Sequence, residues 1–442
     1  MGPVYPEDGP PARPPNYCEI HLGGEPEELT AELYTVWSAG FADPEAQINL
    51  KVDRDWLVEY LRDFGHEPTG RFPDASPLID ELIHRGLLLE FDPEAGDLEQ
   101  LLSRHRLYPR ALGLGSTVHE RELFGIGYGS SRFCAVGPDV YQLWSFALTY
   151  PTLWDACAGY ASGVDADRPP DEEPLHLTAD EVARNVAECL PMLVSTKAAF
   201  LDPLNYDLPT VPGPVEFPTD GGRSASPGRT PVIVPVGVPM GWDFWEGDPA
   251  DRPDQYYQLH LGTRYVDLTM EEFLAWHAAA DGFQQHVRHQ VTKTTLVEHL
   301  RSAEGLPNAE DLVAGMLARG LLVEFDPVQG PLRDLFRAVQ LFPLGDAYGN
   351  TPQRPDLYGL GVEGEILLSI EPEPYMIRSY GLTCASLWDA CTALAEGADE
   401  GLPPGETPVG LSPEDVARSV AIVLPAMISA GCAFIDPLNY AL

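Results

Sequence analysis

Phe200-Leu-Asp-Pro-Leu-Asn-Tyr206 returns as Phe434-Ile-Asp-Pro-Leu-Asn-Tyr440, so seven consecutive positions recur with one substitution. The two stretches lie 234 residues apart (434 minus 200), and Leu153-Trp-Asp-Ala-Cys157 recurs at the same separation as Leu387-Trp-Asp-Ala-Cys391. Similarity at a fixed separation is the sequence mark of an internal repeat. The chain of 442 residues therefore contains one unit written twice.

The two copies set the expected domain boundaries. Matching begins at Tyr17 and Tyr256 with a separation of 239, and from Arg85 and Arg319 onward the separation is 234, so the first copy has five extra residues. They fall in the Gly- and Pro-containing stretch 66–73, which predicts a loop. We expect a disordered tail over 1–16, a first lobe over 17–208, a Pro- and Gly-rich linker over 209–255 and a second lobe over 256–442. The apolar run Val232-Ile-Val-Pro-Val-Gly-Val238 predicts that part of this linker packs on a domain surface.

The first half of each copy predicts three helices with short strands. Leu29-Thr-Ala-Glu32 and Leu268-Thr-Met-Glu271 each predict an N-cap threonine with acidic residues in the first helical turn. Gly86 and Gly320 are expected to end the third helix in a left-handed conformation. The third helix then runs into a predicted β hairpin, which is the winged-helix pattern. The expected elements cover 20–22, 30–37, 56–61, 78–84 and 87–91, and in the second copy 259–261, 269–276, 295–300, 312–318 and 321–325.

The second half of each copy predicts a similar set of elements with different residues. In the first copy the expected strands and helices cover 123–127, 132–136, 140–147, 153–157, 178–190 and 198–203. We therefore expect an α+β fold, a tandem duplication of a lobe made of two winged-helix-like modules. Each module has three helices and a small antiparallel sheet, and the four modules are expected over about 17–110, 111–208, 256–343 and 344–442.

Residues 17–93 and 256–327 resemble the RiPP recognition element, the peptide-chaperone fold of pyrroloquinoline quinone biosynthesis. The resemblance rests on a strand, a Leu-Thr-capped helix with a tryptophan, and a helix that ends in Arg85-Gly-Leu-Leu88 or Arg319-Gly-Leu-Leu322. It implies a domain that binds a leader peptide as an added strand. Such elements are usually single, so four in one chain imply a scaffold or a divergent paralogue. The same pattern is similar to the winged-helix family of transcription regulators.

Charge narrows the class of partner. The chain has 27 basic and 68 acidic residues, a formal net charge of −41, which repels nucleic-acid backbones and anionic membranes and attracts cations. A DNA-reading third helix needs Lys and Arg, whereas this position carries Asp80, Glu81 and His84 in the first copy and Glu310 and Asp311 in the second. We expect no direct nucleic-acid contact and no membrane association.

Composition also indicates the compartment. The N-terminus lacks the basic and apolar zones of a signal peptide, and no apolar run approaches the roughly 20 residues that span a bilayer. Seven scattered cysteines without a Cys-x-x-Cys pair favour buried thiols over disulfides, and Cys157 and Cys391 occupy matching positions. We expect a soluble, cytoplasmic protein, and the abundance of Ala, Gly, Pro and Arg indicates a GC-rich bacterial genome.

No sequence pattern predicts a catalytic centre, a cofactor or a metal. The glycines of 112–115 and 125–130 are not followed by Gly-Lys-Ser/Thr, so they favour strand bends over phosphate binding. His286 and His289, with His277 and His299 nearby, have no counterparts in the first copy, which favours a solvated segment over a zinc site. The chain contains no Gly-x-Ser-x-Gly elbow. An enzyme with its site between the lobes stays an alternative.

We therefore expect a non-catalytic binding or scaffold protein that recognises a protein or peptide of basic character. The alternative is a regulator that acts on a basic DNA-binding protein. Trp37, Trp154, Trp276 and Trp388 are expected in the core. In the repeated C-terminal motif, turn chemistry is favoured over a polar recognition corner. The candidate partner-binding residues are Asp80, Glu81, His84, Arg85, Glu310, Asp311, Arg319, Asp202, Asn205, Tyr206, Asp436, Asn439 and Tyr440.

Overall fold

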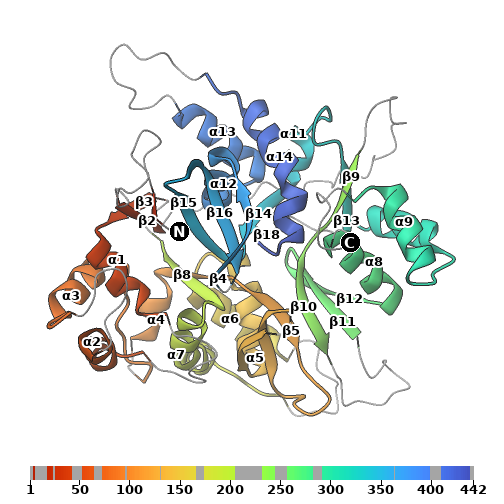
Figure 1. Cartoon of the computed structure of the whole chain (residues 1–442). Helices are drawn as coiled ribbons and strands as arrows, with labels where there is room; N and C mark the ends of the chain where they lie inside the picture. Colours follow the sequence, from red (N-terminus) through yellow and green to blue (C-terminus); the bar gives the residue numbers. More distant parts are fainter. Residues whose placement is uncertain are drawn as a thin grey trace. The chain divides into compact units, whose positions relative to one another are not determined.

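A computed structural model describes most of the chain: residues 3–4, 17–22, 25–41, 52–63, 72–94, 97–129, 131–165, 174–204, 231–243, 256–281, 291–362, 364–398 and 410–438. The chain divides into two compact units. The first-copy unit holds residues 15–208 and 240–255, and the second-copy unit holds 1–14, 209–239 and 256–442. Both units combine helices with mostly antiparallel strands, so the fold is α+β (Figure 1).

The first-copy unit opens with a hairpin followed by three helices. They are β2 (Tyr17–Leu22), β3 (Glu25–Leu29), α1 (Ala31–Ser38), α2 (Arg54–Asp63) and α3 (Ser76–His84). One buried apolar cluster joins the hairpin to all three helices, because each contributes residues at strand or helix spacing: Ile20, Leu29, Leu33, Val36, Leu57, Leu61, Ile79 and Leu82.

The rest of this unit has two groups of paired strands together with the helices that follow α3. The elements are α4 (Leu98–Leu102), β4 (His105–Pro109), β5 (Leu112–Gly115), β6 (Phe124–Tyr128), β7 (Ser131–Val136), α5 (Pro138–Phe146), η1 (Ala147–Thr149), α6 (Leu153–Gly163), α7 (Ala179–Ser195) and β8 (Ala199–Pro203). Strands β5, β6 and β7 form antiparallel pairs, and β4 pairs with β8. Gly115 has φ +73° opposite Trp242 of β10 (Val238–Asp243), and a Cβ there would collide with the Trp242 backbone. This glycine therefore permits a close strand approach.

The second-copy unit begins with the same hairpin and helices. They are β11 (Tyr256–Leu261), β12 (Arg264–Leu268), α8 (Met270–Asp281), α9 (Lys293–Ser302) and α10 (Ala309–Ala318). Here α10 is followed by β13 (Leu322–Phe325), which pairs antiparallel with β9 (Val232–Pro235) from the expected linker. All four residues of β9 are buried, so this part of the linker region belongs to a core.

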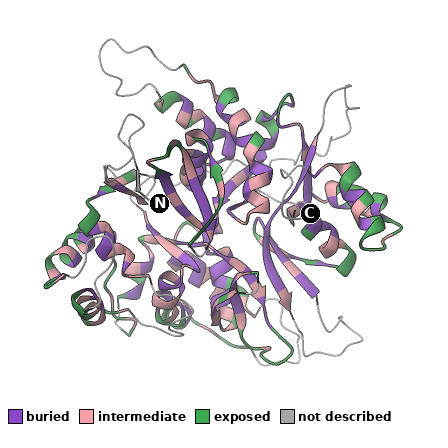
Figure 2. Ribbon diagram, in the orientation of Figure 1, coloured by how far each residue is buried: buried purple, intermediate pink, exposed green. Residues whose placement is uncertain are grey.

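The remaining elements repeat those of the first copy. They are α11 (Arg333–Ala338), β14 (Val339–Pro343), β15 (Asp346–Thr351), β16 (Arg354–Val362), β17 (Glu365–Ile370), α12 (Pro372–Tyr380), η2 (Gly381–Thr383), α13 (Leu387–Gly397), α14 (Pro413–Ser429) and β18 (Ala433–Pro437). Elements β14, α12, α13, α14 and β18 begin 234 residues after β4, α5, α6, α7 and β8. Strands are largely buried, and exposed residues gather on outer helix turns and loops (Figure 2).

The predicted helix caps are confirmed. The Thr30 hydroxyl accepts a hydrogen bond from Leu33 N at 3.3 Å, and Thr269 does the same for Glu272 N at 3.2 Å. Gly86 and Gly320 have φ values of +75° and +70°, the left-handed conformation that ends a helix without strain in glycine.

The predicted strand at 87–91 is wrong, although its counterpart β13 is present. Residues 87–92 form no strand in the structure, whereas β13 has β9 as its partner. A strand is stabilised by the partner that satisfies its backbone groups, and no described strand pairs with 87–92. The hairpin expected after the third helix is also absent from the described residues, because β13 pairs with a strand that precedes the helices.

Strand pairing also differs from the expected module boundaries near 110 and 343. Strand β4 pairs with β8 through Tyr108 and Phe200, whose rings stack at 5.0 Å, and β14 pairs with β18 in the same way. These strands therefore belong with the later helices, and the division within each copy lies before α4 and α11.

The four tryptophans divide by copy rather than behaving alike. Trp276 and Trp388 are each 6 % exposed, whereas Trp37 and Trp154 are only half-buried. The two matching thiols, Cys157 and Cys391, are fully buried and free, and burial raises the pKa of each to about 12. In the part of the chain that the structure covers, every helix is too short or too polar to cross a bilayer.

Candidate partner-binding site

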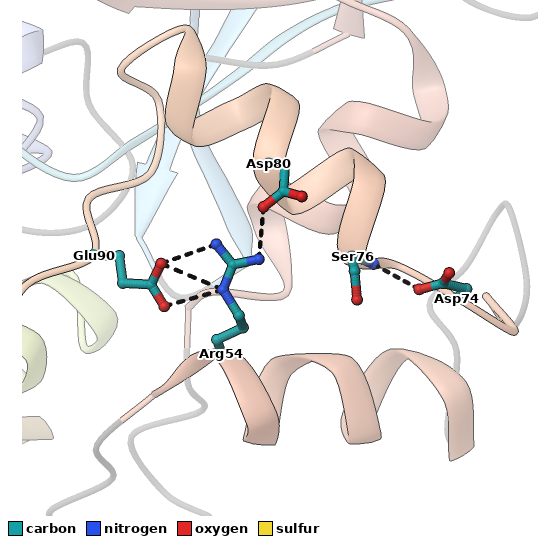
Figure 3. A network of polar contacts seen from close by, with 5 residues as sticks. All are labelled: Arg54, Asp74, Ser76, Asp80 and Glu90. Carbon is teal, nitrogen blue, oxygen red and sulfur yellow. Dashed lines mark hydrogen bonds and ion pairs between the residues drawn. The ribbon is translucent and has the colours of Figure 1, made fainter.

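The third helix of the first copy presents three of the predicted residues to solvent. Asp80, Glu81 and His84 are all exposed on α3. Arg54, at the start of α2, donates to Asp80 at 2.7 Å and makes bonds of 2.9 to 3.3 Å to both carboxylate oxygens of Glu90 (Figure 3). The Arg54 guanidinium lowers the pKa of Glu90 through these bonds. Asp80 is thus occupied by an arginine of the same module, and Glu81 and His84 remain the more available groups.

Two predicted arginines link the third helix of each copy to an earlier element of the same copy. Arg85, just after α3, bonds the Glu27 carboxylate and, at 3.1 Å, the Glu28 carbonyl oxygen of β3. Arg319 occupies the same position after α10 and bonds Glu272 in α8. Both side chains are partly buried. Arg85 connects the end of α3 to β3, and Arg319 connects the end of α10 to α8. We assign them a structural role.

The third helix of the second copy has a different surface. Glu310 and Asp311 are exposed at the start of α10, and Arg301 donates to Glu310 at 3.0 Å. At the position of Asp80 the second copy has Ala314, which is exposed. Both third helices are therefore acidic, but their acidic residues stand at different positions and have different partners.

The repeated C-terminal motif contributes strand residues rather than an exposed corner. Asp202 and Asp436 lie inside β8 and β18 and are 7 % and 4 % exposed, so the closing strand predicted at 198–203 is confirmed. The Asp436 carboxylate accepts from Gly262 N at 2.9 and 3.1 Å, and burial raises its pKa to about 7. Asp436 thereby fixes the turn between β11 and β12. Four further candidates lie outside the described residues: Asn205, Tyr206, Asn439 and Tyr440.

The hairpin turn sets which backbone groups of β12 face outward. Leu261 and Arg264 flank the two-residue turn, where Gly262 has φ +60°, as in a type II′ hairpin. In such a hairpin the flanking pair is hydrogen-bonded and the pairs then alternate. Tyr265 and Asp267 therefore direct their backbone groups away from β11. Among the described residues, β12 is the outermost strand of its sheet.

The corresponding edge in the first copy is different in kind. Strand β3 is also outermost among the described strands, and Pro26 stands opposite His21 at the position that Tyr265 occupies in the second copy. Proline has no N–H to offer, and proline on an edge strand is a common protection against strand addition. The difference between Pro26 and Tyr265 is visible in the sequence. That it lies on an outward-facing strand edge is known only from the strand register.

The described residues contain no group of three or more His, Cys, Asp or Glu placed to hold a metal ion. His299 lies 3.6 Å from Glu304, His277 is exposed on α8, and His286 and His289 lie outside the described residues. The glycines of 112–115 belong to β5 and those of 125–128 to β6, as the interpretation of strand bends predicts. The chain has no significant match to a protein-family model, a curated protein or a solved structure.

Proposed function

We propose that the chain is a non-catalytic binding protein that takes up an extended segment of a basic peptide or protein as an added strand along β12. The observation that carries this proposal is the outward backbone of the exposed Asp267 on β12. On β3 the equivalent Glu28 carbonyl oxygen already accepts from Arg85, and Pro26 on the same edge has no N–H. Main-chain hydrogen bonds along such an edge supply affinity, and the net charge of −41 favours basic partners. The sequence alone pointed to the third helices as the interaction surface. The proposed surface is instead the outer edge of β12.

The order of elements supports the same proposal. A hairpin followed by three helices occurs in each copy, which agrees with the resemblance to peptide-binding recognition elements. We interpret each such body as a winged-helix-like module. A DNA-reading role has less support, because the third helices are acidic and no wing hairpin directly follows them among the described residues.

Asp267→Pro tests the proposal. This change removes the outward N–H at an exposed position, and Asp267→Ala is the matched control because it removes the same carboxylate but keeps the N–H. We expect the full chain and the Ala variant to capture a stoichiometric partner from host lysate, and the Pro variant to lose it by at least about 10-fold, as loss of a main-chain bond with strain implies. Equal capture by both variants, with both folded by circular dichroism, would refute strand addition at β12.

A further inference from the structure

A cavity of about 130 Å³ lies among α11, α13 and α14 of the second-copy unit. These three helices pack together in Figure 1. Its polar and aromatic lining comes from Gly330, Arg333, Trp388, Glu414 and Arg418. It shares no residue with β12. Arg333 and Glu414 are exposed, so the cavity can be reached from solvent.

Two arginines and a tryptophan give this cavity its chemistry. The Arg333 guanidinium carbon lies 5.4 Å from the centre of the Trp388 ring, within the range of a cation–π contact. Arg418 donates to the Gly330 carbonyl oxygen at 3.3 Å. Within the described residues, neither arginine has a carboxylate at ion-pair distance, whereas Arg54, Arg85, Arg301 and Arg319 all do. Two guanidinium groups that line one cavity without an ion-pair partner offer N–H donors to an anion from solvent.

The first copy supplies an internal comparison. At a separation of 234 residues, Trp388 and Arg418 correspond to Trp154 and Arg184, but Arg333 corresponds to Glu99. The duplicated scaffold therefore keeps the tryptophan and one arginine, and reverses the charge of the third group. The cationic site belongs to the second copy alone.

The lining residues restrict the class of anion. The cavity is lined by two arginines and one carboxylate, Glu414, and Asp415 also interacts electrostatically with Arg418, so a monoanion fits the local charge better than a phosphate dianion. Arginine donates a planar pair of N–H groups that match a carboxylate. The face of Trp388, with Pro331, Leu332 and Ala417, provides an apolar wall for the group that bears the carboxylate.

We propose that this cavity binds a carboxylate attached to an apolar group. Arg333 and Arg418 bind the carboxylate, and the indole of Trp388 contacts the apolar part. A free small acid and the C-terminal residue of a peptide share this chemistry, and the experiment separates them.

The test uses the full chain labelled with 5-fluorotryptophan, with the Trp388 resonance among the eight tryptophans assigned through Trp388→Phe. The probes are 3-phenylpropionate, its neutral amide and the free acid of N-acetyl-Gly-Gly-Phe. We expect 3-phenylpropionate to shift the Trp388 resonance with a Kd on the order of 1 mM. Tighter binding of the peptide acid assigns the site to a C-terminus, and weaker binding assigns it to a free acid. The amide is expected to bind at least about 10-fold more weakly than the acid.

Arg333→Glu copies the first-copy residue and is expected to weaken binding by roughly 10- to 100-fold. Arg337→Glu, an exposed position on the same helix outside the cavity, is the matched control and should keep the affinity within about twofold. Glu99→Arg should add a second, weaker site beside Trp154. Equal affinity for acid and amide, or equal losses in the two arginine variants, would overturn the proposal. No shift at any concentration up to the solubility of the probe would overturn it too.

Discussion

The two copies have the same arrangement of helices and strands, and they differ in the residues proposed to bind a partner or ligand. Their helix caps, buried thiols and strand pairs recur at constant separations, as with Cys157 and Cys391. Pro26 on β3 is replaced by Tyr265 on β12, and Glu99 is replaced by Arg333. After duplication the core residues stay constrained, because a change of volume in a close-packed core lowers stability. Residues at sheet edges and on the surface can diverge without that cost. In this chain both differences favour binding by the second copy.

The copies also differ in how deeply equivalent residues are enclosed. His21 has a bond from its ring to Glu19 at 3.0 Å, whereas the equivalent His260 is 1 % exposed and both of its ring nitrogens have no hydrogen-bond partner within the described structure. Trp37 and Trp276 show the same contrast. The extra strand β9 explains part of this difference, because it adds a buried layer that the described first copy lacks. The comparison therefore predicts unequal responses to the same substitution in the two copies.

The largest effect is expected for the first tryptophan of each copy. Trp276→Ala removes a buried ring and the bond from its Nε1 to the Val236 carbonyl oxygen at 3.0 Å, so it should cost about 3–5 kcal/mol in the free energy of unfolding. Trp37→Ala, at a half-buried position, should cost about half as much. Urea unfolding followed by hydrogen exchange in each unit measures both values. Equal losses of unfolding free energy in the two variants would contradict the claim that Trp276 is more deeply buried than Trp37.

The second effect concerns the buried carboxyl that fixes the β11–β12 turn. The pKa of Asp436 is about 7 in the folded chain and close to 4 when unfolded, so the native state holds an extra proton between these values. Its contribution to stability is therefore present at low pH and is lost as the pH rises from about 4 to 7. Asp436→Asn keeps an acceptor for Gly262 N without the charge. We expect it to raise stability at pH 8 by about 2–4 kcal/mol and to have little effect at pH 4.

Urea titrations of both proteins between pH 4 and 8 measure this difference. A constant difference across that range would mean that Asp436 is ionised in the folded chain throughout.

The third effect has the opposite dependence on pH. Burial lowers the pKa of His260 to about 4, and an unfolded histidine titrates near 6.5. Stability from this position is therefore lost as the pH falls from about 6.5 to 4, because only the unfolded chain accepts the proton. His260→Leu should flatten the pH profile of stability in this window by about 1–3 kcal/mol. Thermal unfolding of the His21→Leu variant provides the comparison, and an identical flattening there would contradict the role of enclosure.

The smallest effect is expected at the exposed network of the first copy. Arg54→Ala removes the bonds to Asp80 and Glu90, which are 66 % and 55 % exposed at their side chains. Such surface pairs contribute about 0.5–1 kcal/mol, and less as salt rises. Unfolding at low and high ionic strength measures the loss. A loss of unfolding free energy above about 2 kcal/mol, unchanged by salt, would contradict the assignment of these bonds as weak, solvent-screened surface ion pairs.

Local chemistry in the sequence was enough to predict the caps, the glycine helix ends, most helices and the buried thiols. The threonine caps and Gly86 succeed because each depends on residues a few positions away. The strand at 87–91 fails because a strand depends on a partner elsewhere, and among the described residues β9 pairs with the second copy's strand β13. The candidate site shows the same limit. Asp80 and Arg85 were recognisable as polar residues near a helix end, but their arginine and glutamate partners come from other elements.

Residues that now carry the proposals were not distinguishable by type. Asp267 gains its importance from the alternation of hydrogen bonds along a hairpin, and Arg333 from its position over Trp388. The first depends on strand register, and the second on packing between helices that are far apart in sequence. The copy-to-copy comparison could have pointed to Glu99 and Arg333, because a charge reversal at a matched position is visible without a structure.

The central claim is that β12, and not β3, accepts an added strand. Hydrogen–deuterium exchange of the full chain, with and without the partner that it captures, tests this most directly. We predict that the Asp267 amide is protected at least about 10-fold by the partner, because a new main-chain bond forms there, while amides of β3 exchange as before. Protection along β3 with no change along β12 would contradict the account.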